Sequence, residues 1–133
     1  MTTELYMLVY SALLAMAIPT LFLVGRSGIE GGTAWGLGNR EGPLTGEPEW
    51  IGRATRAHAN LLESLPVFAI LVLVANAIGL SNDMTALGAT LFFYGRIAHL
   101  VTYVLGLVPW RTVVFGVALT GEIMILVEIL GAG

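Results

Sequence analysis

The sequence predicts an all-α integral membrane protein whose four transmembrane helices form a bundle. Hydrophobic residues make up 56% of the 133 residues and charged residues only 11%. The mean hydropathy of +0.85 lies well above that of soluble globular domains. Four apolar runs, each near the roughly 20 residues needed to cross a bilayer, are separated by segments rich in glycine, proline and polar residues.

The first span is expected at about residues 4–25. Its apolar run, Leu5 to Val24, is too long for the core of a signal peptide and has no basic leader, so we interpret it as a retained helix. Pro19 is expected to kink it, because proline removes a backbone donor. The segment Gly25 to Trp50 is rich in Gly and Pro and is expected to be irregular, in water or among lipid headgroups.

The other three spans follow with short connections. They are expected at about 51–79, 84–107 and 110–131 within one domain that covers residues 1–133. Asp83 is expected to cap the third span, and Pro109 to separate the third span from the fourth.

The arginines predict the orientation of the bundle. Four of the six basic residues lie in or beside the first and third loops, namely Arg26, Arg40, Arg53 and Arg111. The termini and the second loop carry no basic side chain. The positive-inside rule therefore predicts that the first and third loops face the cytoplasm and that both termini lie outside.

Several functional classes are excluded by composition. The chain has no cysteine, which excludes disulfides, thiolate nucleophiles and Cys-based metal sites. No basic tract suits nucleic acid, and the formal charge is −3. No spacing offers three convergent metal ligands, so no metal is expected.

Two polar stripes interrupt the apolar helices. The first comprises Arg56, Asn60 and Glu63, at positions i, i+4 and i+7 of the second span. The second comprises Arg96, His99 and Tyr103, at positions i, i+3 and i+7 of the third span. Because a charge at bilayer depth costs about 2.5 kcal/mol or more without a partner, we expect the stripes to face inward and build one polar site.

Arg111 and Thr112 open the fourth span at the same predicted end of the bundle. Arg111, Arg56 and Tyr103 are therefore expected to converge there. Arginine and helix N-terminal amides bind anions, and a neighbouring hydroxyl can donate to a thiolate. The combination favours an acidic ligand whose reactive atom is held ionised.

The pattern Arg-Ala-His-x-Asn-x-x-Glu-x-x-Pro, from Arg56 to Pro66, resembles the signature of the membrane-associated proteins in eicosanoid and glutathione metabolism (MAPEG). The set Arg96, His99, Tyr103 and Arg111 is similar to the third- and fourth-helix motif of that family. The resemblance implies a homotrimer that binds glutathione between subunits near the cytoplasmic face. Members conjugate glutathione to lipophilic electrophiles, reduce lipid peroxides or isomerise lipid endoperoxides.

The resemblance also implies roles for individual residues. It makes Arg111 the residue nearest the thiol, with Thr112 where some members have a serine. It implies glutathione contacts from Arg56, Asn60, Glu63, His99 and Tyr103, with Arg96 in the same network and Arg26 as a further contact. The first loop resembles a bacterial branch, which implies a bacterial inner membrane and gives no reason to expect an eicosanoid substrate.

Structural alternatives stay open for these residues. The stripe from Arg56 to Glu63 is also compatible with an ion-pair network that only fixes helix packing. Arg96 is equally well explained as an interior partner of Glu63, and His99 as a structural hydrogen-bonding group. Tyr103 also suits an interfacial belt, and Arg111 a simple orientation charge.

The function expected from these observations is a membrane-bound, glutathione-dependent transferase or peroxidase that acts on lipophilic electrophiles or lipid hydroperoxides. Glutathione is its co-substrate, and its surroundings are membrane lipids. One alternative is a non-catalytic membrane subunit that binds a lipid, a pigment or a larger membrane complex. A small transporter is a further alternative, because Glu122 lies in the middle of the fourth span.

Overall fold

The computed structural model describes residues 1–133 as an all-α chain, which confirms the predicted fold class. The helices are α1 (Thr3–Ser27), α2 (Gly32–Leu37), α3 (Glu49–Ala77), α4 (Asp83–Val104) and α5 (Val108–Gly131). All except α2 are long and apolar enough to cross a membrane. The largest difference from the expected spans is at α4, which ends at Val104 rather than residue 107.

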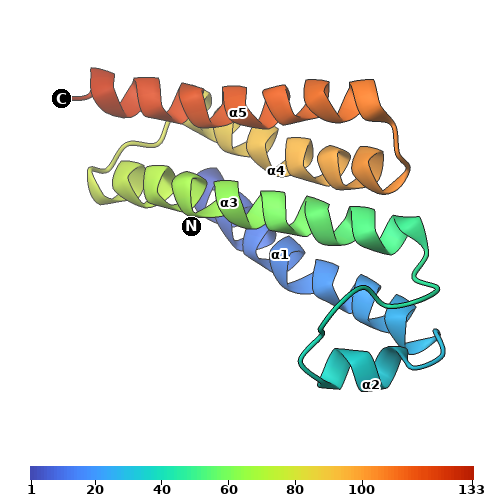
Figure 1. The fold of residues 1–133 in the computed structure, drawn as a ribbon. Helices are drawn as coiled ribbons and strands as arrows, with labels where there is room; N and C mark the ends of the chain where they lie inside the picture. The colour runs from blue at the N-terminus through green and yellow to red at the C-terminus, as the bar shows by residue number, and fades with distance from the viewer.

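The four long helices lie side by side in the bundle (Figure 1). Helix α4 packs along α5, α3 contacts both of them, and α1 packs against α3 and α4 on the side away from α5. The segment between α1 and α3 and the turn between α4 and α5 lie at the same end of the bundle (Figure 1). Arg26, Tyr103 and Arg111 are therefore all at that end.

Two apolar clusters hold the helices together. Between α3, α4 and α5, the rings of Phe68 and Phe92 are stacked with their centroids 3.9 Å apart. Between α1 and α3, Ile18, Ile51 and Leu61 are at the centre of the second cluster. Many other large apolar side chains point outward along the long helices. Their exposure would cost free energy in water but not in contact with lipid.

At the opposite end of the bundle, hydrogen bonds cap α4 and connect it to α1. The N-cap of α4 is Asn82 and not Asp83 as expected, because the Asn82 carboxamide accepts from the Thr85 amide while Thr85 Oγ1 accepts from the Asn82 amide. Glu4 of α1 is buried and accepts hydrogen bonds from Ser81 and Thr85. These contacts attach the beginning of α1 to the beginning of α4.

The first loop contains the short helix α2, so the prediction that this segment is irregular was wrong there. Two glycines allow the tight turn that leads from α1 into α2. Gly31 has a φ of +74°, in the left-handed region that favours glycine. At Gly32, a Cβ atom would lie 1.9 Å from the Arg26 carbonyl oxygen, so no larger residue fits. The glycines that suggested irregular structure instead allow the chain to fold back on α1.

Candidate functional site

A cavity of about 250 Å³ lies between α3, α4 and α5 near the loop end of the bundle. Its lining is Asn60 from α3, His99 and Tyr103 from α4, and Arg111, Thr112 and Phe115 from α5. Five of these six residues are members of the site predicted from the sequence. One residue of the first stripe, two of the second and the beginning of α5 therefore meet in one place.

The wall formed by α4 and α5 is cationic and aromatic. The Arg111 guanidinium lies over the Tyr103 ring, 4.8 Å from its centroid. The Tyr103 ring in turn meets the His99 ring edge to face, with their centroids 5.4 Å apart. A cation–π contact leaves the in-plane N–H donors of arginine free. Arg111 can therefore hold an anion without giving up its contact with Tyr103.

Arg96 lies behind the cavity wall and holds α3 to α4. Its side chain is buried, and Nη2 donates to the Asn60 carbonyl oxygen at 2.7 Å and to Asn60 Oδ1 at 3.0 Å. It also donates to Ser64 Oγ. Since Oδ1 of Asn60 accepts from Arg96, the carboxamide N–H groups of Asn60 are the part left for the cavity. Arg96 acts on the site through Asn60 and does not line it.

Glu63 is on the same face of α3 but is exposed and makes no ion pair within the chain. Neither Glu63 nor Glu122 lies within ion-pair distance of Arg96. The ion-pair network considered for the stripe from Arg56 to Glu63 is therefore not formed. The Glu63 carboxylate is therefore free to pair with a ligand.

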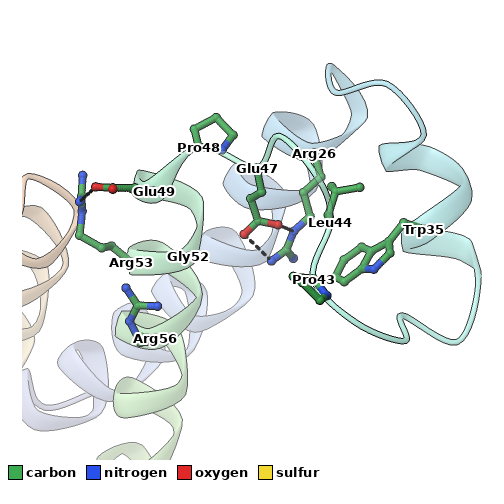
Figure 2. Close-up of a pocket in the computed structure, with 10 residues that line it drawn as sticks. All are labelled: Arg26, Trp35, Pro43, Leu44, Glu47, Pro48, Glu49, Gly52, Arg53 and Arg56. Atoms are coloured by element: carbon green, nitrogen blue, oxygen red, sulfur yellow. Dashed lines mark hydrogen bonds and ion pairs between the residues drawn. The ribbon is translucent and has the colours of Figure 1, made fainter.

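Arg56 does not reach the cavity of Arg111, contrary to the expectation that the two converge. It lines a separate cavity of about 620 Å³ at the loop, shown in Figure 2. Long side chains on a helix point toward its N-terminus, and Arg56 extends back beside Gly52, where a Cβ would lie 3.4 Å from its Nη1. This direction carries the guanidinium away from Asn60.

Arg26 lines the same larger cavity, and its guanidinium is already occupied. Nε donates to Glu47 at 2.9 Å, as Figure 2 shows, and Nη2 donates to Thr55 at 3.3 Å. The group also lies between the rings of Phe22 and Trp35, with Cζ 5.2 Å and 5.0 Å from their centroids. Arg26 thus fastens the first loop to α1 and α3 instead of lying beside the Arg111 cavity.

Replacing Glu47 by alanine is expected to release the first loop. The substitution leaves the Arg26 guanidinium without its half-buried carboxylate partner, which costs about 1.4 kcal/mol and corresponds to a tenfold change in the local opening equilibrium. Limited proteolysis should therefore cleave between residues 28 and 48 about ten times faster. The Glu49→Ala variant is the control, because that carboxylate is 90% exposed in its pair with Arg53. Equal cleavage rates in the two variants would contradict the fastening role of Arg26.

Other residues are assigned by their contacts. His58 Nε2 lies 2.9 Å from the Ala15 carbonyl oxygen, and its ring meets the edge of Phe22, so His58 serves helix packing. Sequence reasoning missed Ser64 as a partner of Arg96, although it follows Asn60 by four residues on the same helical face. It also missed the pairing of Glu47 with Arg26, which no helical spacing could indicate.

The MAPEG family model matches residues 5–131, nearly the whole chain, and the match includes all the residues of the cavity. No curated protein and no solved structure matched the chain.

Proposed function

Because the chain belongs to the MAPEG family and is an integral membrane protein, we propose that it is a glutathione-dependent transferase or peroxidase. Its substrates would be lipophilic electrophiles or lipid hydroperoxides that arrive through the bilayer. One observation carries the proposal: Arg111 and Thr112 border the same cavity as Asn60, His99 and Tyr103. These are a cation, a hydroxyl and an amide beside aromatic side chains of two membrane-spanning helices, a combination that suits a thiolate and an apolar electrophile.

In the proposed chemistry, the thiol of glutathione lies beside Arg111. A nearby guanidinium favours the thiolate over the thiol, and the Thr112 hydroxyl can donate a further hydrogen bond to the sulfur. The thiol proton is lost to solvent, the thiolate forms a carbon–sulfur bond, and the leaving group departs with its electron pair. In the peroxidase reaction, two glutathione molecules are oxidised to the disulfide while the hydroperoxide is reduced to an alcohol and water.

The cavity in one subunit supplies only part of what glutathione needs. The tripeptide carries two carboxylates and an ammonium group, while Arg111 is the single cation in the cavity. Arg56 and Glu63 are exposed and unpaired, and suit a carboxylate and an ammonium. We propose that Arg56 and Glu63 contact glutathione bound between neighbouring subunits of a homotrimer. Arg26 would join only by exchanging Glu47 for a ligand carboxylate.

We further propose a location in a bacterial inner membrane, with the cavity toward the cytoplasm. The first and third loops, which carry or adjoin four of the six arginines, lie at the same end of the bundle (Figure 1). The positive-inside rule assigns that end to the cytoplasm and both termini to the outside. Cytoplasmic glutathione would then reach Arg111 from water while the electrophile arrives from lipid.

The experiment is a paired binding and turnover measurement on purified protein in lipid nanodiscs. We expect saturable binding of glutathione at or below millimolar concentration, and conjugation to an activated aryl chloride or reduction of a fatty-acid hydroperoxide. S-Methylglutathione is the control, since it should bind but give no product because its sulfur cannot ionise. If glutathione binding is absent at millimolar concentration, the proposed function is wrong.

The second candidate is a non-catalytic membrane subunit that binds a lipid, a pigment or a larger complex. Its supporting observation is that Arg26 is engaged by Glu47, and that Arg56 lines a different cavity from Arg111. Glutathione that binds without any turnover, or does not bind at all, would favour this candidate.

A further inference from the structure

Two buried side-chain polar atoms have no hydrogen-bond partner, and neither belongs to a residue that lines the Arg111 cavity. They are Nε of Arg96 on α4 and Oε1 of Glu122 on α5. The Arg96 residue is 2% exposed and Glu122 is 8% exposed. Unpaired buried groups of this kind are costly and need an explanation. One of these atoms is a donor and the other an acceptor, so each can supply what the other lacks.

The packing of α4 on α5 places these two side chains in the same region. A Cβ atom on Gly95, the residue before Arg96, would lie 3.1 Å from the Cβ of Ala118, one helical turn before Glu122. Arg96 and Glu122 nevertheless form no direct ion pair. A single water molecule between them could accept from Nε and donate to Oε1.

The other side of the Arg96 guanidinium determines how Asn60 is presented. Nη2 donates to both the backbone and the side-chain oxygen of Asn60, and Cζ lies 5.7 Å from the ring centroids of both Phe92 and Phe115. The guanidinium therefore has one edge anchored at Asn60 and an Nε without a partner, and the one buried side-chain acceptor without a partner is Oε1 of Glu122. Fixing the Nε edge would fix the direction of the Asn60 carboxamide.

We propose that Glu122 is a positioning residue: by holding Arg96 from α5, it keeps the Asn60 carboxamide turned with its N–H groups toward the cavity. The ligand atom it prepares for is a carbonyl or carboxylate oxygen of glutathione, and for that ligand the inference rests on the proposed function. Glu122 touches no substrate. Glu122 therefore affects the affinity for glutathione and not the rate of the chemical step at Arg111.

The test is a double-mutant cycle on glutathione affinity. Glu122→Gln keeps the shape of the side chain and removes its charge. It is expected to raise the Kd for glutathione about tenfold while kcat at saturating glutathione changes less than twofold. In the Asn60→Ala background the same substitution should change the Kd less than twofold, because the group it positions is gone. Equal weakening in both backgrounds would overturn the proposal in favour of a general packing role.

A matched control and a measurement without ligand complete the test. Glu128→Gln removes another carboxylate of α5, which accepts from Asn82 Nδ2 at 2.6 Å far from the cavity, and should leave the Kd unchanged. Nuclear magnetic resonance of the 15N-labelled carboxamide of Asn60, assigned by its loss in Asn60→Ala, should show an ordered group in the wild type and faster rotation in Glu122→Gln. An unchanged carboxamide signal overturns the positioning role. Absent glutathione binding by the wild type overturns the proposed function instead.

Discussion

Replacing Arg111 by alanine is expected to lower kcat/KM for glutathione conjugation by about 100-fold, the usual loss when one preorganised group that stabilises developing charge is removed. The guanidinium is held over the Tyr103 ring, so it is already in place before the ligand binds. Without it, the thiolate has only the Thr112 hydroxyl and the cavity amide for support. Most of the loss should appear in kcat, measured by steady-state kinetics with an activated aryl chloride.

Two further variants make the Arg111 result specific. Arg111→Lys keeps the charge but loses the planar donor set, so it should recover part of the activity. Arg40→Ala removes an exposed arginine of the first loop whose Nε donates to the Gly36 carbonyl, outside the Arg111 cavity, and should leave kcat/KM unchanged. Conjugation by Arg111→Ala at the wild-type rate would exclude the proposed thiolate site.

The transmembrane helices could be predicted because length and hydropathy determine them almost completely. An apolar run of about 20 residues in a chain with few charges has few alternatives to a membrane helix. The short helix α2 could not be predicted in the same way. It depends on Gly31 and Gly32 folding back against the Arg26 carbonyl, which is a tertiary contact and leaves no hydrophobic period in the sequence.

The candidate site was predictable where helical spacing sets the direction of a side chain. Asn60, His99 and Tyr103 lie on regular stripes, and they line the cavity together with Arg111. The prediction failed for Arg56, because a long side chain extends about one turn toward the helix N-terminus and away from its own stripe. Helical spacing also could not predict the ion pair of Arg26 with Glu47, because Glu47 lies in the first loop.

Replacing Gly121 by alanine is expected to destabilise the bundle by about 3 kcal/mol and to lower the Tm by about 10 °C. A Cβ atom at this position would lie 2.3 Å from the Gly88 carbonyl oxygen and 2.9 Å from the Phe92 amide nitrogen. Both obstacles are backbone atoms of α4, which cannot rotate away as a flexible side chain can. Circular dichroism during heating of the purified protein in detergent measures the effect.

Gly116→Ala on the same helix is the matched control, since a Cβ atom at Gly116 would meet no neighbouring atom within 4 Å. It should leave the Tm unchanged or slightly raised, because alanine favours a helix more than glycine does. Equal Tm values for the two variants would mean that the close approach of α4 and α5 is not required.

The same backbone contact sets the position of α5 along α4, and therefore where Arg111 meets Tyr103 and His99. If Gly121→Ala pushes the helices apart, the guanidinium moves away from the Tyr103 ring and glutathione turnover should fall even below the unfolding temperature. Gly116→Ala should retain full turnover. Stability and activity would then depend on one glycine for the same geometric reason, because only hydrogen at this position lets the two helices approach closely enough to form the cavity.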